Sequence, residues 1–372
     1  MAKAGIYIHI PFCKTKCIYC DFYSVTKRDD SIENFVDCMV KEIRLNEKRL
    51  KNTTYDTIFF GGGTPSVLTE HQLEKILNAL YKFYNIDKNA EVTLECNPGE
   101  ITFEKLSHFR KLGVNRLSIG FQSFSEKNLK FLGRLHSSEQ SISTFNHARK
   151  AGFDNINIDL IYDIPKQKLK EWKNDLFLGT SLEPEHISAY SLTVEKNTAL
   201  HSMVKNKTVI MPSEEVDKKM FLSTISYLEK KNYTHYEISN FSKKNKKCEH
   251  NLHYWRLEPY LAFGPGAHGF DGIKRWWNKK SINHYLNKLE NNELPIESEE
   301  ILSPKDAFNE TIMNGLRLIE GAKIKKLNSY LDMDIKEHLE PYMEKWAYIN
   351  NDGTNLTLNK KGDQILYIYD TK

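Results

Sequence analysis

Between residue 5 and about residue 190, short apolar or β-branched runs alternate with longer amphipathic stretches. The short runs predict six strands: GIYIHI, DTIFFG, EVTLEC, VNRLSIG, INIDLIY and HISAYSL. The longer stretches predict helices over 31–50, 69–84, 102–112, 137–151 and 169–178. Because parallel strands need crossovers of a dozen or more residues, this alternation predicts a parallel sheet covered by helices. Six such units favour an α/β fold built as a partial (β/α)6 barrel over a closed eight-unit barrel.

The alternation ends near residue 200, and we predict a first domain over 1–200. The segment 201–302 contains a helix near 213–231, the run KKNKK and an aromatic, glycine-containing stretch over 254–277. We expect this segment to form an α+β extension of the barrel.

A third domain is predicted over 303–372. Ser303, Pro304 and Asp306 are typical of a helix start, with a capping hydroxyl, proline in the first turn and an acid near the positive end of the dipole. Helices are expected to about residue 346, and AYINNDGTNLTL predicts a hairpin after them. Helices followed by a hairpin resemble a winged-helix module.

Composition and charge narrow the class of protein. The 372 residues are 40% hydrophobic and 27% charged, as in globular proteins, and no stretch approaches the roughly 18 apolar residues of a membrane helix. The start, MAKAGIYIHIPF, lacks the pattern of a secretory signal, so we expect a cytoplasmic protein. A net charge of +4 gives no reason to expect a nucleic-acid partner.

Three of the six cysteines, Cys13, Cys17 and Cys20, lie together in IHIPFCKTKCIYCDF. Structural zinc usually takes two separated pairs of ligands, and no second pair is present. Three close thiolates suit a cubane iron–sulfur cluster whose fourth iron stays open to another ligand. Zinc completed by a distant histidine, or three unrelated thiols, are the alternatives on spacing alone.

A glycine-rich run, GGGTP, follows the second predicted strand and contains Gly62, Gly63 and Thr64. It lacks the spacing of a nucleotide P-loop or a dinucleotide-binding loop. Glycines would let the backbone approach a small zwitterion closely, although a tight turn after a buried strand is the simpler interpretation. Polar residues assigned to further strand ends would line one edge of the sheet, although an acid at a strand end is more often a solvated edge or a helix cap: Glu95, Gln122, Arg134 and Asp159.

The cysteine spacing, with Tyr19 before the last cysteine, resembles the radical S-adenosylmethionine (SAM) superfamily, in which SAM binds the open iron. More narrowly, YIHIPFC, FGGGTP, LECNP, GFQSF and DLIY are similar to the coproporphyrinogen-dehydrogenase-like family. This resemblance implies that Tyr7 and Glu95 contact cluster-bound SAM. It also implies that a second SAM or related ligand is held by Gly62, Gly63, Thr64, Gln122, Arg134 and Asp159.

Two departures point to the heme-chaperone branch of that family, called HemW. Phe22 stands where the dehydrogenase has an additional cysteine, and Tyr7 lies almost at the start, without the dehydrogenase's N-terminal extension. The sequence HNLHYW at 250–255 resembles the branch's HNxxYW signature and implies His250 as a heme ligand. A hydrogen-bonded packing histidine is the alternative. The resemblance implies heme, a [4Fe-4S] cluster and SAM as bound groups, and leaves open whether the protein is an enzyme.

Four nearby lysines, at 243, 244, 246 and 247, suggest a cationic site for heme propionates, or else a solvated loop. Cys248 is either a second thiolate candidate or a buried small thiol. The implied partners are heme-accepting proteins, for example respiratory ones, and the sequence leaves peripheral membrane contact and homodimerisation open. Two rival functions are coproporphyrinogen dehydrogenation and radical chemistry on nucleic acid, the latter opposed by the low charge.

Overall fold

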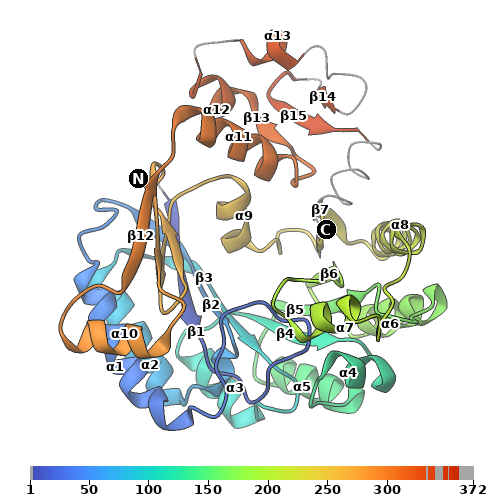
Figure 1. Cartoon of the computed structure of the whole chain (residues 1–372), viewed down its shortest axis with the longest axis horizontal. Helices are drawn as coiled ribbons and strands as arrows, with labels where there is room; N and C mark the ends of the chain where they lie inside the picture. Colours follow the sequence, from blue (N-terminus) through green and yellow to red (C-terminus); the bar gives the residue numbers. More distant parts are fainter. Residues whose placement is uncertain (1–2, 332–333, 340–346, 351, 360–372) are drawn as a thin grey trace.

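A computed structural model describes residues 3–331, 334–339, 347–350 and 352–359. Its centre is a twelve-stranded sheet, and the six predicted strands lie next to one another in chain order (Figure 1). They are β1 (Lys3–Ile10), β2 (Thr54–Gly62), β3 (Ile86–Cys96), β4 (Arg116–Gln122), β5 (Ile156–Tyr162) and β6 (His186–Ser191). All five neighbouring pairs are parallel. The sheet is not closed into a barrel, so the prediction of a partial (β/α)6 barrel is confirmed.

The predicted helices connect these strands. They are α1 (Ile32–Leu45), α2 (Glu70–Phe83), α3 (Phe103–Lys111), α5 (Ser138–Lys150) and α6 (Leu169–Ser181). The side chains of Thr69, Thr102 and Ser137 cap α2, α3 and α5 by accepting a backbone N–H three residues later. Sequence patterning missed α4 (Glu126–Leu132), which is too short to show a clear period and ends at Gly133.

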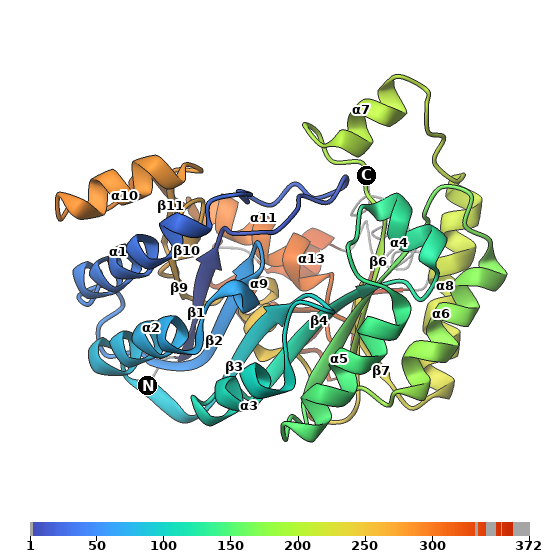
Figure 2. The same ribbon diagram turned by 90° about the horizontal axis from the view of Figure 1, so that it is seen from below.

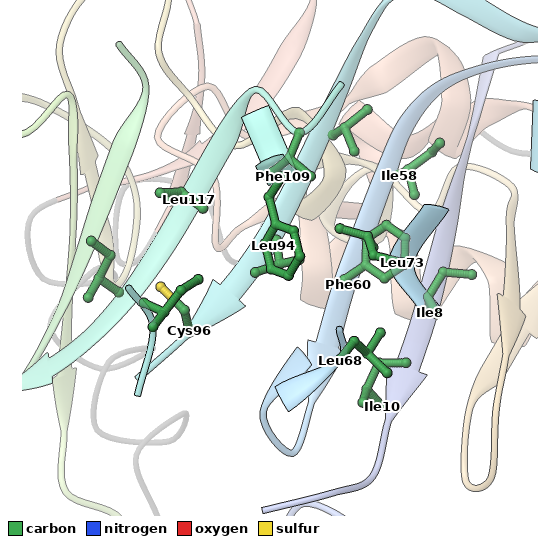
Figure 3. Close-up of a cluster of buried hydrophobic side chains, with 14 of the residues drawn as sticks. Ile8, Ile10, Ile58, Phe60, Leu68, Leu73, Leu94, Cys96, Phe109 and Leu117 are labelled. Carbon is green, nitrogen blue, oxygen red and sulfur yellow. The ribbon is translucent and has the colours of Figure 1, made fainter. Parts of the chain in front are cut away.

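The two faces of the central sheet differ in polarity. Ile8, Phe60, Leu94 and Leu117 pair in register and face the helices, where they pack with side chains such as Phe109 of α3 (Figures 2 and 3). Because strand side chains alternate, the opposite face carries the intervening residues. We call it the inner face, and define it by Tyr7, Phe59, Glu95, Ser118 and Asp159.

The segment 201–302 extends both edges of this same sheet. On the β6 side it adds β8 (Asn240–Ser242) and β7 (Thr234–Glu237), and on the β1 side β9 (Tyr260–Phe263), β10 (His268–Phe270), β11 (Lys274–Asn278) and β12 (Ile296–Ile301). Its helices are α7 (Ala199–Lys205), α8 (Glu214–Lys230), α9 (Glu249–Trp255) and α10 (Ile282–Glu290). The predicted α+β character is found, and the strands of this segment are continuous with the barrel sheet.

The C-terminal segment has its own small sheet and its own hydrophobic cluster. Its elements are α11 (Pro304–Gly315), β13 (Ala322–Lys323), α12 (Ile324–Asn328), α13 (Ile335–Leu339), β14 (Ala347–Ile349) and β15 (Asn355–Leu358). The predicted helix start and the β14–β15 hairpin are confirmed. The predicted helical stretch over 340–346 lies outside the described residues, and the winged-helix assignment and domain limits stay predictions. Within the described part, no helix is long and apolar enough to cross a membrane.

A buried carboxylate on α1 joins the barrel to the extension. Glu42 accepts hydrogen bonds from the Gly264 N–H (2.9 Å), the Asn278 amide (2.6 Å) and the Tyr285 hydroxyl (2.6 Å). Burial raises the pKa of Glu42 to about 7, although these three donors act in the opposite direction. The folded protein therefore holds a proton on this group at a pH where the unfolded chain has released it.

We expect Glu42 to make the free energy of unfolding fall as the pH rises from about 4.5 to about 7, because the folded state binds the proton more tightly. The slope from this one group is at most about 1.4 kcal/mol per pH unit. Urea unfolding of wild type and Glu42→Gln across this range should show a smaller slope in the variant. The exposed Glu74→Gln serves as the control; equal slopes in wild type and Glu42→Gln would contradict the prediction.

Candidate cluster and SAM site

The loop that follows β1, residues 11–25, carries the three clustered cysteines, and we call it the cysteine loop. Its two ends are held together, because the Cys13 N–H donates to the Val25 carbonyl (3.0 Å) and the Val25 N–H donates to the Pro11 carbonyl (2.7 Å). Cys13, Cys17 and Cys20 are half-buried. The loop thus presents three accessible thiols beyond the carboxyl end of β1, where active sites of parallel sheets form.

The donor set fits the iron–sulfur cluster expected from the sequence. Among the described residues, no three His, Cys, Asp or Glu side chains converge closely enough to hold one metal ion. A cubane needs no such convergence, because each thiolate binds a different iron. Burial raises the pKa of Cys13, and that of Cys20 to about 11, so metal binding would displace thiol protons. Three thiols on one loop leave a corner of such a cluster free.

The glycine-rich run lies against the start of the cysteine loop. The Gly63 N–H donates to the Ile10 carbonyl and the Thr64 N–H to the Phe12 carbonyl, both at 2.8 Å. A side chain at 63 would collide with this backbone, since its Cβ would lie 2.7 Å from the Phe12 oxygen. The close approach brings the Thr64 hydroxyl to 3.5 Å from the Cys13 sulfur, as a donor. The run is therefore a tight turn and also a wall of the cysteine site.

Arg134 follows α4 and is not at a strand end as the sequence suggested. It connects a second cysteine to the ends of β3 and β4. Its guanidinium donates to the Cys17 sulfur (3.4 Å), the Asn97 side-chain oxygen (2.5 Å) and the Gly120 carbonyl (3.1 Å). The Asn97 amide in turn donates to the Thr64 hydroxyl (3.0 Å). Sequence reasoning did not select Asn97; its position two residues after Glu95, just beyond the end of β3, was the available signal.

Gln122 ends β4 in the left-handed conformation, with φ of +65°. A Cβ placed on Gly120 would lie 2.8 Å from the Gln122 amide nitrogen and 3.2 Å from the Arg134 guanidinium. The structure therefore brings Gln122 and Arg134 together over Gly120, and the ligand that the resemblance assigns to them stays a prediction. Such amide and guanidinium groups can hold a carboxylate or an adenine edge.

Tyr7 and Glu95 lie side by side on the inner face, on either side of Gly61. A Cβ at Gly61 would be 3.1 Å from the Tyr7 ring and 3.2 Å from a Glu95 carboxylate oxygen. Burial raises the pKa of Glu95 to about 8, helped by the nearby Asp159 carboxylate and opposed by the Gly62 N–H. A cationic ligand at this position would favour the ionised carboxylate.

His9, which sequence reasoning did not select, orients Tyr7. The His9 Nε2 lies 2.8 Å from the Tyr23 carbonyl, which can only accept, so Nε2 must carry the proton. The other nitrogen, Nδ1, then accepts from the Tyr7 hydroxyl at 3.1 Å. His9 thereby ties the tyrosine to the far end of the cysteine loop. The sequence feature that could have identified His9 is its position two residues after Tyr7, on the same face of β1.

Asp159 lies within β5, and is not at the strand end as the sequence suggested. Its carboxylate accepts from the Ser118 hydroxyl (3.1 Å) and the Asn157 amide (2.8 Å), and burial raises its pKa. Asp159 nevertheless shares the inner face with Glu95, and its carboxylate is close enough to raise the pKa of Glu95. It forms the floor of the site, below the residues at the strand ends.

The structure places His250 as a packing residue of the inner face, near the amino ends of the strands. It is 1% exposed, and its two ring nitrogens are hydrogen-bonded to the Thr57 and Tyr254 hydroxyls, both at 2.8 Å. Iron binding would require one of these bonds to break, so the ligand role of His250 stays a prediction. Cys248 is also buried, and its thiol lies 3.7 Å from the Glu91 carboxylate.

The lysine run lies beside the loops that lead into β5 and β6. It is therefore at the amino ends of these strands, whereas the cysteine loop follows the carboxyl end of β1. The Lys243 ammonium donates to the Glu183 carbonyl and the Lys246 ammonium to the Asp154 carbonyl, both at 3.0 Å. Lys247 lies over the Tyr236 ring, 5.5 Å from its centroid. These contacts hold the run against the fold, and its role toward propionates stays a prediction.

Comparison with known proteins agrees with this geometry. The family model described as radical SAM superfamily matches residues 7–178. Among curated proteins, heme chaperone HemW of Bacillus subtilis is 33% identical, over 86% of this chain and 85% of the relative. HemW of Lactococcus lactis is 36% identical, over 87% of this chain and 84% of the relative.

Among solved structures, coproporphyrinogen III oxidase (HemN) from Escherichia coli aligns with 98% of this chain and 88% of its own, with a TM-score of 0.84. At 21% sequence identity this likeness shows a shared fold. Membership of the radical SAM superfamily implies a [4Fe-4S] cluster and SAM, which the cysteine loop and its surroundings suit. The extent and identity of the curated matches show that this chain belongs to the HemW heme chaperone family within the radical SAM superfamily.

Proposed function

We propose that this protein is a heme chaperone, which binds heme together with a [4Fe-4S] cluster and SAM and passes the heme to acceptor proteins. The observation that carries the proposal is the identity of 33–36% to proteins named heme chaperone HemW, over most of both chains. The proposed acceptors are heme proteins, for example respiratory ones, and a cytoplasmic location, dimer formation and peripheral membrane contact stay predictions.

Each part of the site receives a role in this proposal. Cys13, Cys17 and Cys20 would hold the cluster beside SAM, and such a centre would supply reductive cleavage of SAM when both groups are bound. Tyr7 and Glu95 contact the bound SAM. The residues proposed to hold a second SAM or related ligand are Gly62, Gly63, Thr64, Gln122, Arg134 and Asp159.

Coproporphyrinogen III dehydrogenation is the second candidate, because the fold is shared with the coproporphyrinogen III oxidase HemN. Phe22, 62% exposed on the cysteine loop, stands where that family's enzymes carry another cysteine. The presence of phenylalanine instead of this cysteine favours the chaperone over the dehydrogenase. No observation favours the third candidate, radical chemistry on nucleic acid.

The purified, anaerobically reconstituted protein should therefore bind heme with a distinct Soret band and transfer it to an apo-hemoprotein. Absorbance difference spectra would follow both steps, with serum albumin preloaded with heme as the control donor. The reduced protein with SAM and coproporphyrinogen should form no protoporphyrinogen. Turnover at enzymatic rates, with no heme transfer above the albumin control, would replace the chaperone proposal with the dehydrogenase.

A further inference from the structure

The hairpin of β10 and β11 carries an exposed imidazole, His268. Neither of its ring nitrogens has a hydrogen-bond partner among the described residues. His250, in contrast, has both nitrogens occupied and is buried. Histidine nitrogen is a common axial ligand of heme iron, and a ligand needs a free lone pair and open space. Of these two histidines, only His268 offers both in this structure.

Trp277 holds the His268 ring from one side. The two residues are directly paired across the hairpin, and their rings stack with centroids 5.7 Å apart and planes at 20°. Trp277 is half-buried, so part of its indole remains accessible. Because an imidazole that binds heme iron stands upright on the porphyrin, the nearly parallel Trp277 ring would contact the porphyrin through its edge and add apolar contact beside the iron ligand.

The strand register places His268 on the same face of the sheet as Tyr7. His268 and Phe270 are two residues apart in β10 and share a face. Phe270 pairs with Tyr260, and Tyr260 pairs with Gly5, which is two residues before Tyr7 on the same face of β1. Paired residues project to the same side of a sheet. The exposed imidazole therefore stands on an extension of the inner face, which also carries Glu95.

The cysteine loop comes close to the start of this hairpin. A Cβ at Gly266, two residues before His268, would lie 3.5 Å from the Tyr23 Cβ. Tyr23 belongs to the cysteine loop and lies three residues after Cys20. This contact places the cysteine loop next to the turn that leads into β10 and His268.

Charge at the hairpin also suits heme, whose two propionates are anionic. Lys279 and Lys280 directly follow β11, are exposed, and have no ion-pair partner among the described residues. Partial burial, Lys280 and Arg275 lower the pKa of His268, which favours the neutral imidazole that binds iron. Unlike the lysines of the 243–247 run, these two are adjacent to an accessible histidine.

We propose that heme binds on this hairpin, with a nitrogen of His268 coordinated to the iron, Trp277 against the porphyrin, and Lys279 and Lys280 near the propionates. The inference rests on the proposed heme-chaperone function and assigns it a site different from the HNLHYW segment. Heme held there would adjoin the cysteine loop.

The test is an anaerobic heme titration followed by the Soret band. His268→Ala should weaken binding at least tenfold and shift the band, while the exposed His71→Ala on α2 should leave both unchanged. Free imidazole added to His268→Gly should restore the wild-type spectrum. Lys279→Glu with Lys280→Glu should weaken binding more at low than at high salt. Cluster iron content and the unfolding transition would confirm that each variant is folded.

The outcomes separate the site from the function. If wild type binds heme and His268→Ala binds it with unchanged affinity and spectrum, the site is wrong while the chaperone proposal stands. If a folded His250→Ala loses the band and His268→Ala keeps it, the ligand is His250 and the inference is overturned. If wild type shows no saturable heme binding, the proposed function itself fails.

Discussion

Protein carrying Cys17→Ser should retain less than about a tenth of the wild-type cluster iron after anaerobic reconstitution. A serine hydroxyl stays protonated near neutral pH and cannot replace a thiolate, so the cluster would keep only two protein ligands. The Arg134 guanidinium would also lose the sulfur that it contacts at 3.4 Å. Iron and acid-labile sulfide per chain, together with the EPR signal of the reduced protein, would measure the loss.

Cys38→Ser is the matched control, because Cys38 is buried in α1 and its thiol contacts Asn34 and the Leu286 carbonyl. This variant should bind as much iron and sulfide as wild type. Equal iron content in Cys17→Ser and wild type would show that Cys17 is no ligand. Wild-type protein that takes up zinc but no iron and sulfide would contradict the cluster assignment for all three cysteines.

Gly62→Ala should cost at least about 3 kcal/mol of unfolding free energy and should also reduce cluster loading. Gly62 has φ of +108°, and an added Cβ would lie 2.5 Å from the His9 ring. That ring cannot easily move aside, because it is hydrogen-bonded to both Tyr7 and the Tyr23 carbonyl. Displacing it would disturb the end of the cysteine loop. Urea unfolding and cluster iron content would measure the two effects.

Gly152→Ala separates backbone strain from collision. Gly152 also has positive φ, +89°, but its added Cβ would meet nothing within 4 Å. This variant should lose about 1–2 kcal/mol of unfolding free energy, because a residue with a Cβ is strained in the left-handed conformation. It should bind as much cluster iron as wild type. Equal destabilisation and equal iron content in the two variants would show that the collision of the added Cβ at 62 with His9 lowers neither stability nor cluster loading.

The strand and helix order was predictable because it follows from local patterns. The parallel strands can be recognised in the sequence as short apolar or β-branched runs. The capping residues Thr69, Thr102 and Ser137 mark the starts of three helices. The three cysteines were predictable as a site because all of them lie within eight residues of one loop. A chelating loop of this kind needs little help from distant segments.

Residues that act through long-range contacts were harder to find. Asn97 and His9 matter because they touch Arg134 and the Tyr23 carbonyl, which are 37 and 14 residues away in the chain. HNLHYW suggested either a heme ligand or a packing histidine, and only the fold shows that His250 is buried and hydrogen-bonded to Thr57 and Tyr254. Local sequence does not report which side chains a sheet brings together, since that depends on register.

The sequence by itself thus determined the alternation of strands and helices, the cysteine triad and the glycine-rich turn, because each depends on neighbours along the chain. Only the tertiary structure decided which polar groups share the inner face, and which histidine remains open. The extension adds β9 beside β1, and this pairing carries β10 and His268 to the same face as Tyr7. That arrangement is set by hydrogen bonding between strands more than 200 residues apart, beyond the reach of any local pattern.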